Sequence, residues 1–222
     1  MTVAVLALQG AFIEQEQMLD RLGVAHIELR QAADLKQDFD GLILPGGEST
    51  TQSLLLHEQE MFEPLQKRIQ DGMPVLATCA GMILLASAIE GQEAAHFATL
   101  PITVKRNAYG RQLGSFHTVS EVKGIGEVPM TFIRAPYVSE AAPDVKILAE
   151  VDGKIVGVRC GNQFAYAFHP ELDEDTRIHE LFLQTISNSY SLKKRPEMTN
   201  IGFSNSLSST GLLYIPIPVQ SD

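Results

Sequence analysis

The chain has 222 residues, of which 45% are hydrophobic and 20% charged, so it can form one sizeable folded domain and is too apolar for wholesale disorder. Its formal net charge of −10 argues against nucleic acid or an anionic membrane as the main partner, because both favour basic surfaces. A local basic patch is compatible with this net charge, because three basic residues lie close together in the sequence at Lys105, Arg106 and Arg111.

The N-terminal segment and the cysteines both favour a cytoplasmic protein. The apolar run at residues 1–8 lacks a basic leader and stops at Gln9-Gly10, so it is too short for a signal peptide or a membrane span. The two cysteines, Cys79 and Cys160, do not make a disulfide framework, and we expect the reducing cytosol as their compartment. Cys160 is interpreted as structural.

Short apolar runs alternate with helical patterns through the first half of the chain. Buried parallel strands are predicted for residues 3–8, 25–29, 41–44 and 74–78. The spacing of apolar residues predicts helices at 11–22, one or two over 51–71, and 80–89. This alternation indicates βαβ units, so we expect an α/β fold with an open, mainly parallel sheet flanked by helices.

Strand-like segments dominate the second half of the chain. They cover residues 99–105, 113–122, 129–134, 145–151, 154–159 and 163–168. Asp152-Gly153 between two β-rich runs is a hairpin signal, so we expect an antiparallel extension of the sheet. An acidic start followed by apolar residues at helical spacing predicts a final helix, with one face formed by Ile178, Leu181, Phe182, Thr185 and Ile186.

The helical pattern ends near residue 188. Residues 189–222 are rich in Ser, Asn, Thr, Gly and Pro, and prolines twice interrupt the apolar stretch close to the end. We therefore expect one domain at residues 1–188 and a peripheral tail at 189–222, either disordered or laid against the surface.

Cys79 lies between the strand predicted at 74–78 and the helix that starts at the next residue. A nucleophile on such a sharp turn stands above the sheet, where backbone N–H groups can bind an oxyanion and a helix N-terminus favours a thiolate. Small residues at positions 77, 80 and 81 suit a tight turn. A buried structural cysteine is the alternative, and Cys79 alone does not decide between the two.

His169 is the histidine best placed to act as a base. It follows the strand predicted at 163–168 and opens His169-Pro170-Glu171, so the imidazole and the Glu171 carboxylate can lie side by side. Glu171 would hold one imidazole tautomer while the other ring nitrogen faces the thiol. A capping or surface His–Glu pair is the alternative. Surface or amphipathic contexts are expected for the other histidines, His26, His57, His96, His117 and His179.

Two adjacent glycines follow the strand predicted at 41–44. Gly46 and Gly47 let the backbone approach a ligand and turn an amide towards it, as an oxyanion hole requires. Glu48 and Ser49 could meet the α-amino and α-carboxylate groups of an amino acid. A phosphate-binding loop is disfavoured because its glycine-lysine pattern is absent, whereas a plain turn stays an alternative.

These three motifs resemble those of the class I (triad) glutamine amidotransferases in order and spacing. More closely, the chain resembles the family of glutaminase subunits of pyridoxal 5′-phosphate synthase from about residue 3 to 187. The resemblance is carried by segments 6–11, 42–51, 78–81, 106–112, 132–137 and 167–172. It implies a flavodoxin-like α/β fold of the class I amidotransferase type.

The resemblance also implies roles for single residues. Cys79 would attack the side-chain amide of L-glutamine, His169 would transfer the proton, and Glu171 would orient His169. The residues implied for the oxyanion hole are Gly46, Gly47 and Ala80. Those implied for glutamine binding are Gly47, Glu48, Ser49, Arg106, Ile133 and Arg134. A guanidinium fork suits a substrate carboxylate, although each arginine has a surface ion pair as its alternative.

The expected partner follows from the same resemblance. The family works with a (β/α)8-barrel synthase subunit that uses the released ammonia to make pyridoxal 5′-phosphate, which would be the product of the complex and not a cofactor of this chain. No metal, nucleic acid or membrane is expected. Partner docking would arrange the oxyanion hole, and Gln9 and Gly10 are the expected interface.

The sequence departs from the family pattern at two places, and two other functions are disfavoured. Ala77 stands where glycine is usual, and residues 112–117 differ from the usual acidic variant, but neither removes a catalytic group. An amidotransferase subunit of another pathway, such as histidine biosynthesis, is disfavoured by segments 106–111 and 133–137. A non-catalytic interaction protein is disfavoured by the intact Cys, His and Glu.

Overall fold

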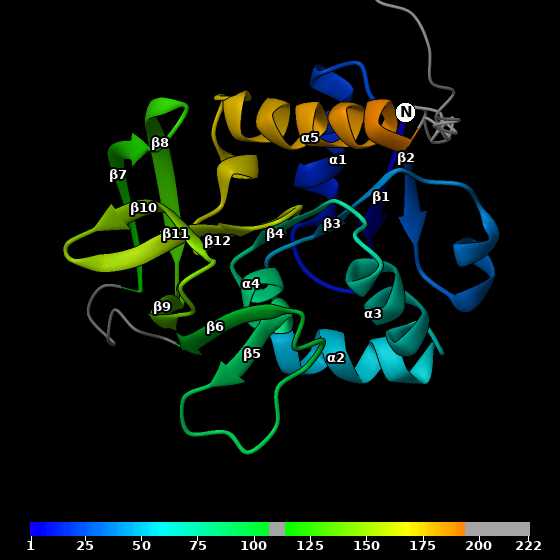
Figure 1. Cartoon of the computed structure of the whole chain (residues 1–222), viewed down its shortest axis with the longest axis horizontal. Helices are drawn as coiled ribbons and strands as arrows, with labels where there is room; N and C mark the ends of the chain where they lie inside the picture. Colours follow the sequence, from blue (N-terminus) through cyan, green and yellow to red (C-terminus); the bar gives the residue numbers. More distant parts are fainter. Residues whose placement is uncertain (107–113, 194–222) are drawn as a thin grey trace, which may run out of the picture.

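The computed structural model describes residues 1–106 and 114–193, which fold around a ten-stranded sheet (Figure 1). Four parallel strands form one end of the sheet in the order β2-β1-β3-β4. Their bounds, β1 Thr2–Leu6, β2 Ala25–Leu29, β3 Gly41–Leu44 and β4 Val75–Thr78, confirm the predicted parallel strands. The chain reverses its direction of travel across the sheet between β1 and β3, and ligands bind at the carboxyl ends of strands beside such a switch point.

Helices cover both faces of the parallel strands. Figure 1 shows two helices on one face, α1 (Phe12–Arg21) and α5 (Arg177–Lys193). The opposite face carries α2 (Ser49–Glu58), α3 (Phe62–Gln70) and α4 (Ala80–Leu85). Two short 3-10 turns are η1 (Ala32–Lys36) and η2 (Pro170–Leu172). The helical stretch predicted at 51–71 is two helices, because the chain turns at Glu60, whose φ is 54°.

The helix predicted at residues 80–89 is too long. α4 ends at Leu85, and the chain continues as β5 (Ala86–Ile89), which pairs in parallel with β6 (Leu100–Lys105). The prediction is wrong because pairing with β6, a later segment, makes residues 86–89 a strand. The sequence itself does not signal this change, since residues 86–89 include none that stops a helix.

Antiparallel strands extend the sheet beyond β4, as predicted. β12 (Gln163–Tyr166) is parallel to β4 and antiparallel to β11 (Lys154–Cys160). β11 also pairs with β9 (Tyr137–Ala141) and with β10 (Lys146–Val151), and Asp152-Gly153 forms the predicted hairpin turn between β10 and β11. β9 was not predicted, because its short polar segment directly follows a proline and becomes a strand only by pairing with β6 and β11.

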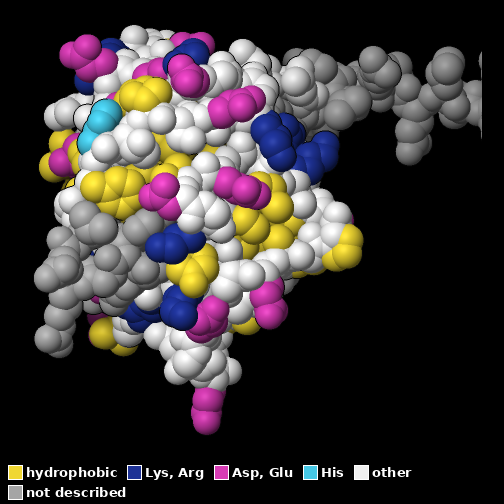
Figure 2. Space-filling model, turned by 90° about the vertical axis from the view of Figure 1, so that its left-hand side faces the viewer, with side chains coloured by type: hydrophobic (Ala, Val, Ile, Leu, Met, Phe, Trp, Pro, Cys, Tyr) yellow, Lys and Arg dark blue, Asp and Glu magenta, His cyan; other side chains and the backbone are white. Residues whose placement is uncertain are grey.

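β7 (Ser115–Val122) and β8 (Gly126–Ile133) form a separate antiparallel ribbon at the edge of the molecule. Two of the segments predicted as sheet extensions therefore pair with each other. Figure 2 shows the molecule from this side, where Lys and Arg side chains lie beside Asp and Glu side chains and small apolar groups. The charges on this face are mixed in sign.

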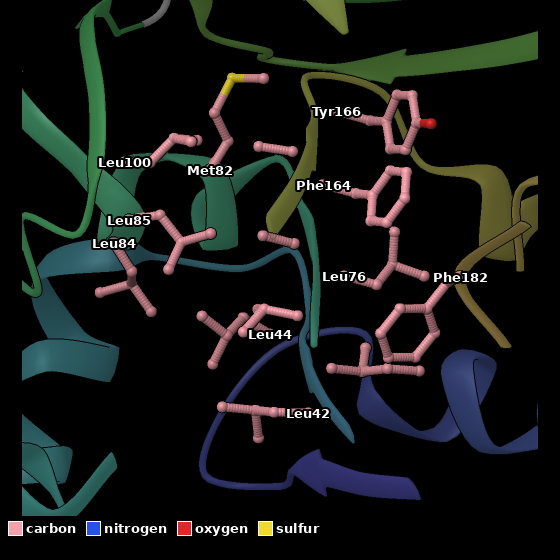
Figure 3. Close-up of a cluster of buried hydrophobic side chains, with 14 of the residues drawn as sticks. Leu42, Leu44, Leu76, Met82, Leu84, Leu85, Leu100, Phe164, Tyr166 and Phe182 are labelled. Carbon is pink, nitrogen blue, oxygen red and sulfur yellow. The ribbon is translucent and has the colours of Figure 1, made fainter. Parts of the chain in front are cut away.

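Side chains of the central strands are buried on both faces of the sheet (Figure 3). Leu76, Phe164 and Phe182 lie together on the side covered by α5, and Leu85 and Leu100 lie on the opposite side. Burial on both faces explains why these strands are continuous apolar runs in the sequence. The packed core fixes the strand ends from which the site is built.

The last helix runs beyond the end of its sequence pattern. α5 continues to Lys193, past residue 188, and the predicted apolar face is buried at Ile178, Phe182 and Ile186. The remainder of the predicted tail, residues 194–222, lies outside the described residues. None of the helices in the described ranges combines the length and apolar character that crossing a membrane requires.

Candidate active site

The carboxyl ends of β1, β3, β4 and β12 meet at one pocket, because these strands run parallel. Its volume of about 210 Å³ is below the roughly 300–1,000 Å³ of sites for drug-sized ligands and suits a small metabolite. The walls are formed by Gln9, Gly10, Ala11, Gly46, Gly47, Glu48, Ser49, Cys79, Ile83, Arg106, Ile133, Arg134 and His169. All the predicted catalytic, glutamine-binding, oxyanion-hole and interface residues line it except Ala80 and Glu171. Ala80 follows Cys79, and Glu171 contacts His169 from the buried side.

Cys79 occupies a strained turn between β4 and α4. Its φ of 48° and ψ of −101° lie where side chains are disfavoured, at a cost on the order of 1–3 kcal/mol. Its N–H donates to the Tyr166 carbonyl at 2.8 Å, which ties the turn to β12. Gly81 is required in the next turn, because a Cβ there would overlap the Leu44 carbonyl. The buried thiol Sγ lies 3.8 Å from the Ile133 carbonyl oxygen, so these contacts hold the sulfur at the pocket.

His169 and Glu171 form a buried pair in the same site. The imidazole Nδ1 lies 2.8 Å from Glu171 Oε1, and the His169 N–H donates to the Thr131 carbonyl at 2.8 Å. Burial alone would lower the pKa of His169, but hydrogen bonds to Cys79 and Glu171, together with their charges, raise it to about 10. The imidazole therefore favours its protonated form at neutral pH.

Two glycines allow the loops of the site to touch. A Cβ on Gly46 would overlap the imidazole of His169, and a Cβ on Gly10, whose φ is +103°, would overlap the Gly46 carbonyl. The Gly46 carbonyl accepts a hydrogen bond from Ala11 N–H at 2.9 Å, so the segments after β1 and β3 are joined. A larger residue at either position would displace the site.

The three N–H groups expected to bind an oxyanion differ in their present partners. Gly46 N–H donates to Thr78 Oγ1 at 3.1 Å. The N–H groups of Gly47 and Ala80 donate to no acceptor within residues 1–106 and 114–193. Gly47 and Ala80 are thus free to bind an oxyanion, whereas Gly46 would first have to leave Thr78.

Charged groups of both signs surround the mouth of the pocket. The Glu48 carboxylate lies between two guanidinium groups, with Oε2 3.7 Å from Arg106 and Oε1 3.6 Å from Arg134. Arg106 also donates to Thr50 Oγ1 at 3.3 Å. Ser49 is buried, and its hydroxyl has no hydrogen-bond partner among the described residues. Two cations, a carboxylate and an unpaired hydroxyl can bind the charged groups of a free amino acid.

Sequence reasoning assigned no role to three buried polar residues near the site. Thr78, Gln15 and His179 form a line of hydrogen bonds that ends at Glu171. His179 was expected in a surface or amphipathic context but is fully buried. It precedes the buried Phe182 by three residues, so helical spacing was the available signal.

One predicted motif is described only in part. Residues 107–113, which include Arg111 of the basic cluster and most of segment 106–112, lie outside the described residues. Arg106, the one described residue of segment 106–112, lines the pocket.

Known proteins resemble this chain in sequence over most of its length. Residues 5–188 match the model of the SNO glutamine amidotransferase family. A Desulfitobacterium hafniense (strain DSM 10664 / DCB-2) protein named pyridoxal 5′-phosphate synthase subunit PdxT is 60% identical over 191 residues, which are 86% of this chain and 96% of the relative. The Methanocorpusculum labreanum protein of the same name is 53% identical over 189 residues, 85% of this chain and 100% of the relative.

Solved structures agree in fold with this chain. A glutamine amidotransferase crystal structure has a TM-score of 0.79 and 42% identity, covering 83% of this chain and 98% of its own. The structure of PurLQS from Thermotoga maritima, at 16% identity and a TM-score of 0.58, covers 85% of this chain and 98% of the matched chain and shows the fold alone. The family match contains Cys79, His169 and Glu171. This chain therefore belongs to the SNO glutamine amidotransferase family.

Proposed function

We propose that this chain is the glutaminase subunit of a pyridoxal 5′-phosphate synthase, which hydrolyses L-glutamine to L-glutamate and ammonia. The observation that carries the proposal is the buried His169–Glu171 pair, joined to Cys79 on its strained turn. The names of the relatives at 53% and 60% identity support the same assignment.

Acylation begins from a thiolate on Cys79 and an imidazolium on His169, in which Nε2 carries the proton of the thiol because Nδ1 is held by Glu171. The sulfur attacks the side-chain amide carbon of glutamine, and the carbonyl electron pair moves onto oxygen, where the N–H groups of Gly47 and Ala80 stabilise the charge. The C–N bond then breaks, and His169 returns the proton to the leaving nitrogen, which departs as ammonia. A γ-glutamyl thioester on Cys79 remains.

Deacylation uses the same groups with water as the nucleophile. Neutral His169 takes a proton from water, the water oxygen attacks the thioester carbon, and the C–S bond breaks when the intermediate collapses. The thiolate and the imidazolium are restored, and glutamate leaves after its new carboxyl group loses a proton to solvent. Glu171 keeps Nδ1 protonated and stabilises the imidazolium throughout.

The mouth of the pocket supplies the groups for substrate recognition. Arg106 and Arg134 bind the α-carboxylate through charge-assisted hydrogen bonds, and Glu48, released from them, binds the α-ammonium group. The unpaired hydroxyl of Ser49 adds a further polar contact. Ile133, which lines the pocket, packs against the substrate methylenes.

The ammonia passes to a (β/α)8-barrel synthase subunit in the cytoplasm, and pyridoxal 5′-phosphate is the product of that complex and not a cofactor of this chain. Gln9 and Gly10 form part of the interface. Gln9 Oε1 accepts the Glu48 N–H at 2.8 Å, and Gly10 lies against the Gly46 carbonyl. Contact at Gln9 and Gly10 therefore reaches the oxyanion loop directly, which supports the expectation that docking arranges it.

Glutamate release by the full-length chain, with and without the barrel synthase, tests the proposal. We expect the barrel synthase to stimulate release and Cys79→Ala to abolish it. Cys160→Ala, the matched control in β11, should leave the rate unchanged. The mechanism is wrong if the pair releases no glutamate or if Cys79→Ala remains active.

An amidotransferase subunit of another pathway would hydrolyse glutamine equally well, so the partner decides the pathway. Pull-down with the full chain separates the two functions. Capture of the barrel synthase supports pyridoxal phosphate synthesis, whereas capture of a different synthase refutes that pathway and leaves the glutaminase standing.

A further inference from the structure

A line of buried hydrogen bonds connects α5 and α1 to the triad. His179 Nε2 on α5 lies 2.8 Å from Gln15 Oε1 on α1, and Gln15 Nε2 donates to Thr78 Oγ1 at 3.2 Å. Thr78 Oγ1 donates to Glu171 Oε1 at 3.4 Å. His179, Gln15 and Thr78 are fully buried, so solvent does not compete for these bonds. The hydrolysis proposed above assigns them no part.

The hydroxyl of Thr78 has one direction left for its proton. A hydroxyl donates one hydrogen bond and accepts two. Thr78 Oγ1 accepts from Gly46 N–H at 3.1 Å and from the Gln15 amide. Because both acceptor positions are filled, the hydrogen points to Glu171, the remaining polar neighbour.

His179 decides which end of the Gln15 amide faces Thr78. In the reversed orientation, Gln15 Oε1 would face Thr78 and compete with Glu171 for the hydroxyl proton. Burial lowers the pKa of His179 to about 3, so the imidazole is neutral at working pH. Because Gln15 Oε1, an acceptor, faces Nε2, this neutral ring carries its proton on Nε2, and that donation keeps the amide nitrogen towards Thr78.

We propose that Gln15 and His179 are positioning residues of the triad that act through Thr78 on the Glu171 carboxylate, an inference that rests on the proposed function. Glu171 Oε2 has no hydrogen-bond partner among the described residues, so His169 and Thr78 are the two side chains that hold this carboxylate. If Thr78 loses its fixed direction, the carboxylate can turn away from His169. Turnover should then fall without a change in glutamine binding.

A purely structural polar contact between α1 and α5 is the competing explanation. The contact costs folding free energy, because His179 Nδ1 is buried without a partner in the described part of the chain. Apolar side chains at positions 15 and 179 would join the helices without that cost. The other end of the line is the hydrogen bond from Thr78 to Glu171, where it affects the orientation of the carboxylate.

The test compares Gln15→Met in two backgrounds, the full-length chain in complex with the barrel synthase, and the same complex carrying Thr78→Val. Gln15→Met keeps the length of the side chain but neither donates to Thr78 nor accepts from His179. In the first background kcat should fall about three- to tenfold, which corresponds to the net free energy of one hydrogen bond, and KM should stay unchanged. In the Thr78→Val background it should have no further effect, because the route to Glu171 is already broken.

A second pair of variants keeps the inference testable if Gln15→Met does not fold. His179→Leu removes the donor to Gln15, whereas the amide nitrogen of His179→Gln can restore it. We expect kcat to fall in His179→Leu and to recover in His179→Gln. Met18→Leu, a buried and volume-matched change on α1, is the control for disturbance of the helix and should leave kcat unchanged.

Alkylation of Cys79 by iodoacetamide separates failure of this inference from failure of the proposed function, since it needs no glutamine. The alkylation rate at neutral pH should follow the same pattern as kcat across the variants. If the wild-type complex releases no glutamate, the proposed function fails. The alkylation rates of the variants still show whether Gln15 and His179 position the triad. An unchanged rate in Gln15→Met, or an equal loss with and without Thr78→Val, would overturn the inference.

Discussion

Replacing Glu171 with glutamine removes a charge from the site and keeps its shape. The glutamine Oε1 can still accept the Nδ1–H of His169, so the imidazole keeps its tautomer and its orientation. Any change in the pH dependence of the variant therefore reports the charge of the carboxylate.

The magnitude follows from the pKa of His169. A rise from 6.5 to about 10 corresponds to about 5 kcal/mol in favour of the protonated imidazole. Burial opposes this rise, and the hydrogen bonds and charges of Cys79 and Glu171 produce it. Loss of one adjacent opposite charge should lower the pKa by about 1 to 3. The imidazolium then loses its proton at lower pH, so the basic limb of activity should move down by the same amount.

The assay is kcat/KM for glutamate release by the full-length complex across the alkaline range, together with the pH profile of Cys79 alkylation. Asp173→Asn is the matched control, because Asp173 is a nearby carboxylate that bonds Thr131 and His117 and not His169. Its basic limb should coincide with that of the wild type. A basic limb in Glu171→Gln that stays at the wild-type pH or moves upward would refute the reasoning.

Three further changes test other parts of the site. Gly46→Ala should lower kcat by about 100-fold, because a Cβ there displaces His169. Gly72→Ala has open space around its Cβ position and should keep wild-type kcat, although its φ of +92° makes the substitution cost stability. Arg106→Gln and Arg134→Gln should each raise the KM for glutamine by about 10- to 150-fold with kcat nearly unchanged, since a hydrogen bond to a charged group contributes about 1.5–3 kcal/mol, and an unchanged KM contradicts the assigned roles. His179 should make stability fall with acid, because the unfolded chain takes up a proton below pH 6.5 that the folded chain, with the His179 pKa near 3, refuses. Urea unfolding should show the wild type losing about 1.6 kcal/mol more than His179→Leu between pH 6.5 and 5.

The sequence predicts the parallel half of the fold and most of the pocket for one physical reason. A strand buried on both faces is a continuous apolar run, and the residues that follow such runs lie at the carboxyl edge of the sheet. Cys79, His169 and the Gly46-Gly47 pair each follow such a run, so their positions along the chain place them together. At these residues the apolar run that is visible in the sequence also determines where the residue lies in the fold.

The missed features depend on contacts between distant segments. β5 and β9 are strands because of their pairing partners, and their own residues do not demand it. The bonds from Gln15 to Thr78 and from Gln15 to His179 span 63 and 164 residues. A buried glutamine on an amphipathic helix resembles a surface residue until the opposite helix is in place.

Ala77 stands at a position where the resemblance leads us to expect glycine, and the packing around the turn accommodates alanine there. Ala77 lies within β4, fully buried, and pairs with Leu44 on one side and Ala165 on the other, so its Cβ occupies an ordinary strand position. The tight approach occurs after Cys79, where Gly81 lies against the Leu44 carbonyl. The steric demand of the turn therefore falls on Gly81, and alanine at position 77 leaves the geometry of Cys79 intact.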